Sequence, residues 1–142
     1  ASAVRLKSSC VAAAASNAAR ASAGWSAAIT PDTLEAQLVV VPGVIAADQP
    51  AEARAAFEAA AATHDDFSLT ALAHAVGMAG SGVIGFALAR GHLDAVAAFE
   101  AASLDDLWQL ETWGEDHVAR QRLDNLEAEF LALGRYFVAL RA

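Results

Sequence analysis

Six large apolar side chains recur near the end of the 142-residue chain, at alternating steps of three and four residues. This spacing places them on one face of an α-helix, with most of the charged residues of the segment lying off that face. A helix with one apolar stripe must bury it against other elements. The pattern therefore predicts a long C-terminal helix packed into a helical core, and it is typical of a core and not of a cofactor site. The stripe consists of Leu123, Leu126, Phe130, Leu133, Phe137 and Leu140.

The composition agrees with a helical fold. Hydrophobic residues make up 56% of the chain, and alanine supplies much of that fraction. Alanine is the strongest helix former and loses no side-chain entropy on folding. The run Leu38-Val39-Val40-Val41 is followed by Pro42-Gly43 and Val44-Ile45, which reads as two short extended pieces around a turn. We therefore predict a mainly α, compact helical domain with a short β-ribbon near residues 38–45.

Several helix boundaries can be predicted from capping residues and breakers. Pro50 opens a helix after the ribbon. Residues 67–90 are the most apolar stretch of the chain, and Gly91 is well placed to end it. A short helix is expected over residues 93–101. Ser103 can cap the next helix, whose first turn carries two aspartates.

The charge balance excludes several classes of function. The net charge is −8, which argues against nucleic acid and against anionic membrane surfaces as partners. Cys10 is the only cysteine, so no internal disulfide is possible, and a reducing compartment is expected. Neither CxxC nor HExxH occurs, and the four histidines show no ligand spacing. We expect no metal and no cofactor.

The N-terminal region differs from the rest of the chain. No acidic residue precedes Asp32, whereas Arg5, Lys7 and Arg20 lie among serine and alanine. Such a composition resembles a mitochondrial transit peptide, and it also suits an ordinary alanine-rich helix. We predict an N-terminal extension of uncertain order over residues 1–17 and one helical domain over residues 18–142.

Two patterns in the apolar stretch suggest other functions. Residues 80–85 spell GxGxxG, the string of a dinucleotide-binding turn. That turn needs a strand before the glycines, but residues 69–79 have the composition of a helix. Residues 67–89 also approach the length of a membrane span, with Gly77, Ser81 and Gly85 spaced every four residues. Asp65 and Asp66 precede the stretch and favour a helix start in water. A buried, closely packed helix therefore explains both patterns better.

The unusual segment is LDDLWQLETWGEDH over residues 104–117. Trp108 and Trp113 stand among five carboxylates, and no basic residue lies between Arg90 and Arg120. One interpretation is that both indoles belong to the core, with the acids on a solvated face, and Trp108 is expected to be largely buried. The other is a binding site for a basic or amphipathic segment of a partner, because acids beside aromatic surface suit such a segment. Both interpretations remain open at this point.

These residues carry a resemblance to a known family. The segment LDDLWQLETWGED, with FSLTAL, ALARG and the LVVVPGVI ribbon ahead of it, resembles the C-terminal helical domain of the F1-ATPase assembly chaperones that act on the alpha subunit. The resemblance covers about residues 18–142 and depends mainly on the Trp-Gln…Trp-Gly-Glu-Asp spacing. The strand-rich N-terminal domain usual in that family is not found in these residues, and residues 1–17 match nothing expected there.

The resemblance implies a non-enzymatic chaperone or assembly factor that binds the unassembled alpha subunit of F1 ATP synthase and needs no cofactor. The alternative is a non-catalytic helical structural subunit of a larger, ATP synthase-type complex. No nucleic acid and no direct membrane insertion are expected. The compartment implied is the mitochondrial matrix in a eukaryote and the cytoplasm in a bacterium. The partner-binding residues implied are Trp108, Glu111, Trp113, Gly114, Glu115 and Asp116.

Overall fold

The structure, a computed structural model, describes Leu34, residues 36–39 and residues 48–142. Six helices follow one another along the described part of the chain, which confirms the mainly helical prediction. None of these helices is long and apolar enough to cross a membrane. The helices are α3 (Ala51–Ala62), α4 (Asp66–Ala79), α5 (Gly82–Arg90), α6 (Ala95–Ala102), α7 (Leu104–Trp113) and α8 (His117–Arg141).

The apolar stripe of the last helix forms much of the core. Leu123, Phe130, Leu133 and Phe137 are buried, and Leu126 packs against the core with partial exposure. Their helix, α8, spans 25 residues. Phe130 meets Phe99 of α6 edge to face, with ring centroids 6.1 Å apart, a favourable geometry for two aromatic rings. Only the last member of the stripe, Leu140, is exposed.

The predicted β-ribbon near residues 38–45 is not supported. The described residues contain no strand, and Leu38 and Val39 belong to none, while residues 40–45 lie outside the described part. The side-chain amide of Gln49 provides a physical reason. Its Oε1 accepts a bond from the Val39 N–H, and its Nε2 donates to the Val39 carbonyl, both at 2.9 Å. One side chain thus pairs the two backbone groups that a neighbouring strand would pair.

The most apolar stretch folds as two helices instead of one. Gly80 ends α4 in the left-handed region at φ 61°, and the Ser81 hydroxyl then caps α5 by accepting from the Ile84 N–H. A helix therefore precedes the GxGxxG string, as the sequence indicates, and the dinucleotide-binding turn has no strand to start from. Gly85 of α5 lies so close to Val76 of α4 that a Cβ there would be 2.6 Å from Val76 Cγ2. The glycine allows the two helices to pack closely.

The other helix ends mostly follow the predicted signals. Pro50 precedes α3, and Gly91 ends α5 at φ 77°. The Asp65 carboxylate caps α4 by accepting from the Ser68 N–H at 2.7 Å, and this bond lowers the pKa of Asp65 from its usual 3.8. Ser103 holds the N-cap position of α7, but its hydroxyl makes no capping bond, and its buried Oγ has no hydrogen-bond partner among the described residues.

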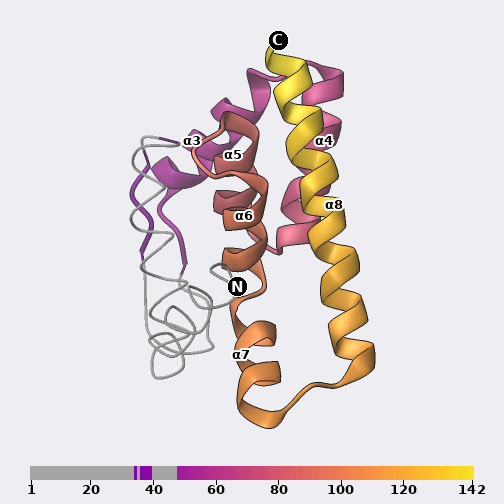
Figure 1. The fold of residues 1–142 in the computed structure, drawn as a ribbon. Coiled ribbons are helices and arrows are strands. Elements are labelled where there is room, and N and C mark those ends of the chain that lie inside the picture. The colour runs from indigo at the N-terminus through magenta and orange to yellow at the C-terminus, as the bar shows by residue number, and fades with distance from the viewer. Residues whose placement is uncertain (1–33, 35, 40–47) are drawn as a thin grey trace.

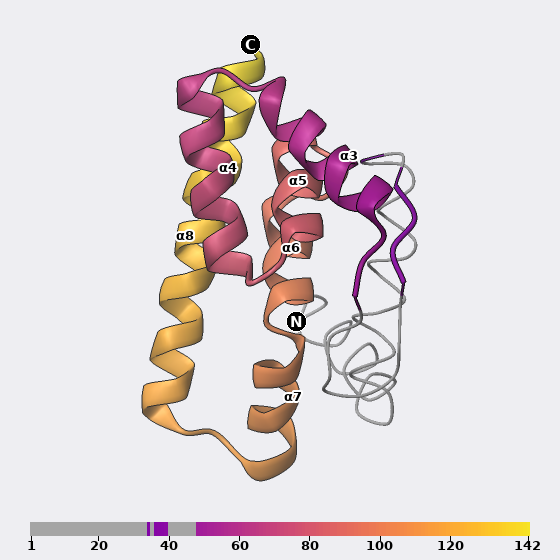
Figure 2. The same cartoon turned by 180° about the vertical axis from the view of Figure 1, so that it is seen from behind.

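The helices form a bundle with one projecting end. Helices α6 and α7 follow one another along one side, and α8 returns in the opposite direction beside α6 and α4 (Figures 1 and 2). Helix α7 and the first turns of α8 extend beyond α4 and α5, whereas the C-terminus lies at the other end of the molecule (Figure 1). The unusual acidic segment therefore lies at an end of the fold, where Leu110 belongs to the core and Leu107 packs against it.

Candidate partner-binding site

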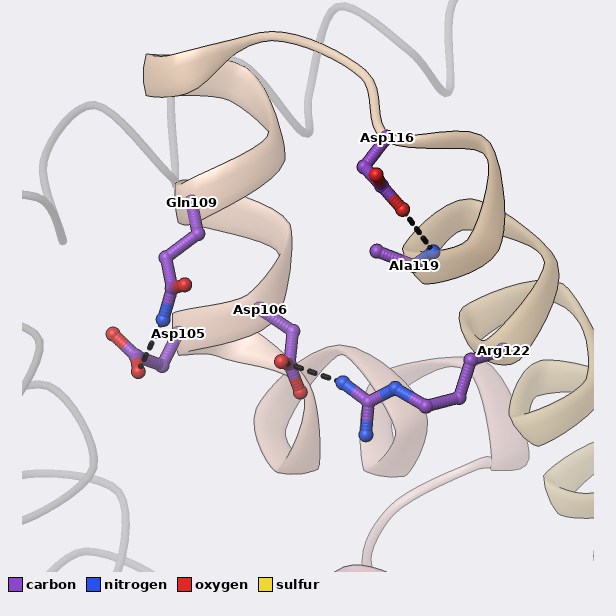
Figure 3. A network of polar contacts seen from close by, with 6 residues as sticks. All are labelled: Asp105, Asp106, Gln109, Asp116, Ala119 and Arg122. Carbon is purple, nitrogen blue, oxygen red and sulfur yellow. Dashed lines mark hydrogen bonds and ion pairs between the residues drawn. The ribbon is translucent and has the colours of Figure 1, made fainter.

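The turn that joins α7 to α8 is built by the backbone of one glycine and the side chain of one aspartate. The Gly114 N–H donates to the Leu110 carbonyl at 3.1 Å, and Gly114 then takes φ 95°, a conformation that favours glycine. The Asp116 carboxylate caps α8 by accepting from the Ala119 N–H at 2.8 Å (Figure 3). Gly114 and Asp116 thus set the geometry of the turn.

An ion pair between α7 and α8 braces the turn. Arg122 Nη2 lies 2.6 Å from Asp106 Oδ1, a contact between residues 16 apart in the chain (Figure 3). Within α7, the Gln109 amide donates to the Asp105 carboxylate at 3.1 Å. Both interactions are exposed, so each contributes little to the free energy of folding. The Arg122–Asp106 ion pair joins α7 to the start of α8, whereas the Gln109–Asp105 bond lies within α7.

Two more carboxylates lie beside the turn, with different partners. Glu115 Oε1 accepts two bonds from the Arg120 guanidinium, at 2.8 and 3.1 Å, and this pair is also exposed. Glu111 is exposed in the last turns of α7, and its carboxylate makes no hydrogen bond or ion pair within the described part of the chain. Glu111 is therefore the acid of this segment that can take a partner's cation without breaking an existing contact.

A large apolar side chain stands exposed among these acids. Trp113 is 79% exposed, and Val118, on the first turn of α8, is 76% exposed. Trp108 is partly exposed, but most of the residue is covered, as expected. The interpretation that both indoles belong to the core is thus wrong for Trp113. We name the acidic tip the segment from Glu111 to Val118.

The acidic tip brings together five of the six residues predicted as a partner site: Glu111, Trp113, Gly114, Glu115 and Asp116. The sixth, Trp108, lies further back on α7. Sequence reasoning missed Val118, although a signal for it existed. Val118 lies five residues before Leu123, which places it well away from the buried stripe of α8. Whether the predicted residues bind a partner stays a prediction.

The acidic tip presents an exposed indole and several carboxylates to solvent. Among the described residues, no group of three or more histidine, cysteine, aspartate or glutamate side chains could hold a metal ion. An exposed indole beside carboxylates can enter an apolar pocket while the acids pair with lysine or arginine around it.

Replacing Asp116 and Glu115 in turn should show which of the two side chains stabilises the fold. We expect Asp116→Ala to lower the free energy of unfolding by about 1 kcal/mol, because α8 loses its N-cap. Glu115→Ala should cost at most about 0.5 kcal/mol, because it breaks only an exposed ion pair. Urea unfolding of the two variants beside the unmodified protein measures the difference. Equal losses in the two variants would contradict the capping role.

Comparisons with known proteins gave matches among solved structures. No protein-family model matches the sequence, and no curated protein matches it. Two solved structures of Atp12 from Paracoccus denitrificans, one carrying an Asp-to-Lys substitution, superimpose with TM-scores of 0.72 and 0.76 at 30% identity. The matches cover 82% and 85% of this chain, and 48% and 53% of those.

A third solved structure is a candidate chaperone from Agrobacterium tumefaciens. It superimposes with a TM-score of 0.69 at 30% identity, over 80% of this chain and 42% of that one. The chain thus spans about half the length of these relatives. Over that half, its helical fold is similar to that of Atp12 and of the candidate chaperone. These similarities support an Atp12-type assembly chaperone family.

Proposed function

We propose that this protein is an assembly chaperone that binds the unassembled alpha subunit of F1 ATP synthase and releases it when F1 forms. The observation that supports this most is Trp113, exposed among carboxylates at the tip of an Atp12-type fold. The protein acts by binding and not by catalysis. The compartment is the one in which F1 assembles, the mitochondrial matrix in a eukaryote or the cytoplasm in a bacterium.

The client of the proposed chaperone is the unassembled alpha subunit. A subunit that will be buried in a larger assembly exposes apolar surface beforehand, and such surface aggregates. A binder with an apolar centre and a charged rim covers that surface, and the rim can exchange its contacts with water when the client leaves. The net charge of −8 helps keep the complex in solution.

The role assigned to the acids can be tested on Glu111. Glu111→Lys should weaken capture of purified alpha subunit by about tenfold, because a lysine there repels a basic client surface. Its free energy of unfolding should stay within about 0.5 kcal/mol, because Glu111 is exposed and its carboxylate has no partner within the described residues. Capture of alpha subunit on immobilised protein measures the first effect, and urea unfolding measures the second.

The matched control is Glu129→Lys, the same charge reversal at an exposed glutamate of α8 away from the tip. It should capture alpha subunit as the unmodified protein does, and purified beta subunit should be captured poorly by all three proteins. Undiminished capture by Glu111→Lys would remove this acid from the site. Stable, stoichiometric association with finished F1 would instead indicate a structural subunit.

A further inference from the structure

A groove lies in the half of the molecule that holds the C-terminus, away from the acidic tip. It has a volume of about 500 Å³ and runs between the end of α5, the start of α6 and the C-terminal half of α8. This volume lies within the range of pockets that hold small ligands. We name it the basic groove, and its main apolar and cationic lining residues are Leu88, Leu93, Val96, Leu131, Arg135 and Val138.

The shape of the groove comes from small residues at its base. Gly134 of α8 lies against Ala95 of α6, where an added Cβ would come within 2.8 Å of the alanine methyl. Gly91 lies under the Arg141 guanidinium, which would be 3.5 Å from an added Cβ. The two helices therefore approach closely at the base, and larger side chains stand on either side of it.

The walls of the groove present apolar surface to water. Val96 is 42% exposed, Leu131 is 37% exposed and Val138 is 60% exposed. These three side chains come from two helices and line one pocket, so they form a continuous patch and not scattered single exposures. Apolar patches framed by charged residues are typical of protein-binding surfaces.

The charge of the groove is opposite to that of the chain as a whole. Residues 130–142 contain Arg135 and Arg141 and no acidic residue, in a chain of net charge −8. Arg141 Nη1 donates to the Ala89 carbonyl at 2.5 Å and so forms part of the wall. Arg135 is exposed, and its guanidinium makes no hydrogen bond or ion pair to any residue that the structure describes.

One acid lines the groove, but it is already engaged. The Asp94 carboxylate caps α6 by accepting from the Ala97 N–H at 2.8 Å. An aspartate in that position stabilises the helix start, and its carboxylate makes no ion pair with Arg135. The Arg135 charge is therefore available to a carboxylate from outside the molecule.

We propose that the basic groove binds an apolar segment of a partner protein that carries carboxylate side chains. Its apolar residues cover Val96, Leu131 and Val138, and a carboxylate pairs with Arg135. This site is distinct from the acidic tip, which suits basic segments, and it does not depend on the identity of the client there. The protein then holds two segments of opposite charge at its two ends.

Two labelled synthetic peptides test the proposal. Both carry leucine at helical spacing, one with flanking glutamates and the other with lysine in their place. Fluorescence anisotropy of the full chain should show binding of the glutamate peptide, although the net charge of the protein opposes it. Arg135→Glu should weaken that binding by about tenfold and Arg135→Gln by less.

The matched control is Arg122→Glu, which makes the same change in net charge on the same helix but near the tip. It breaks only an exposed ion pair and should leave the affinity for the glutamate peptide within about twofold of the original. Failure of the glutamate peptide to bind, or an equal loss in Arg122→Glu and Arg135→Glu, would overturn the proposal. Sedimentation of the protein alone completes the test. Self-association that Arg135→Glu abolishes would make a second copy the occupant, and would also overturn it.

Discussion

Replacing Gly85 with alanine is expected to lower the free energy of unfolding by about 1–3 kcal/mol, as overpacking does in a closely packed core. The new methyl would lie 2.6 Å from Val76 Cγ2 and 3.1 Å from the Val76 Cα and backbone nitrogen. The valine side chain can rotate, but the backbone contacts remain unless α4 and α5 move apart. Because these helices pack together along much of the bundle, other core contacts would be lost with them.

Gly77→Ala provides the matched control. Gly77 also lies within a helix, but an added Cβ there would meet nothing within 4 Å. The same chemical change should then stabilise the protein by about 0.5–1 kcal/mol, because alanine is the better helix former. Urea unfolding with linear extrapolation gives both values. If Gly85→Ala were as stable as Gly77→Ala, close packing at the GxGxxG string would not be its role.

The elements that could be predicted from sequence are those whose signals are local. The stripe of α8 fixes both the helix and the face it buries, and Phe130 and Leu133 are buried as that spacing requires. Pro50 and Gly91 mark helix ends because one starts a helix easily and the other takes a left-handed conformation without strain. Each of these signals acts within a few residues of the chain.

The elements that could not be predicted depend on side-chain contacts or backbone conformations that composition does not reveal. Leu38 and Val39 have strand-forming side chains, yet the Gln49 amide, ten residues from Val39, pairs with the Val39 backbone in place of a strand. The break at Gly80 divides a stretch that looks continuous by composition, because the left-handed conformation of one residue changes the direction of the helix. The first outcome depends on a contact between residues ten apart, and the second on the backbone conformation of a single glycine.

The candidate site, like the fold, could be predicted from the sequence only in part. The acidic segment stood out by residue type, the family resemblance implied its site residues, and the structure brings five of these residues to one turn. The exposure of Trp113 could not be predicted, because it depends on how far α7 extends beyond α4 and α5 (Figure 1). The basic groove could not be predicted either, since α5, α6 and α8 meet there only in the folded chain.

Trp113→Ala is expected to weaken capture of the alpha subunit by about 30-fold, the effect of losing about 2 kcal/mol at an interface hot spot. Tryptophan is among the residues most often found at such hot spots, because its ring buries much apolar area when a partner covers it. The free energy of unfolding should change by at most about 0.5 kcal/mol, since the side chain is 79% exposed in the free protein.

Trp108→Ala is the control that separates loss of binding from loss of stability. Trp108 is half-buried on the same helix, so its truncation should lower the free energy of unfolding by more than that of Trp113. Capture of the alpha subunit, measured where both variants are fully folded, should fall further for Trp113→Ala. The reverse order would place the contact surface on the side of α7 that carries Trp108. Native capture by Trp113→Ala would mean that the client is held elsewhere, because no other side chain of the acidic tip presents an aromatic ring of that size to solvent.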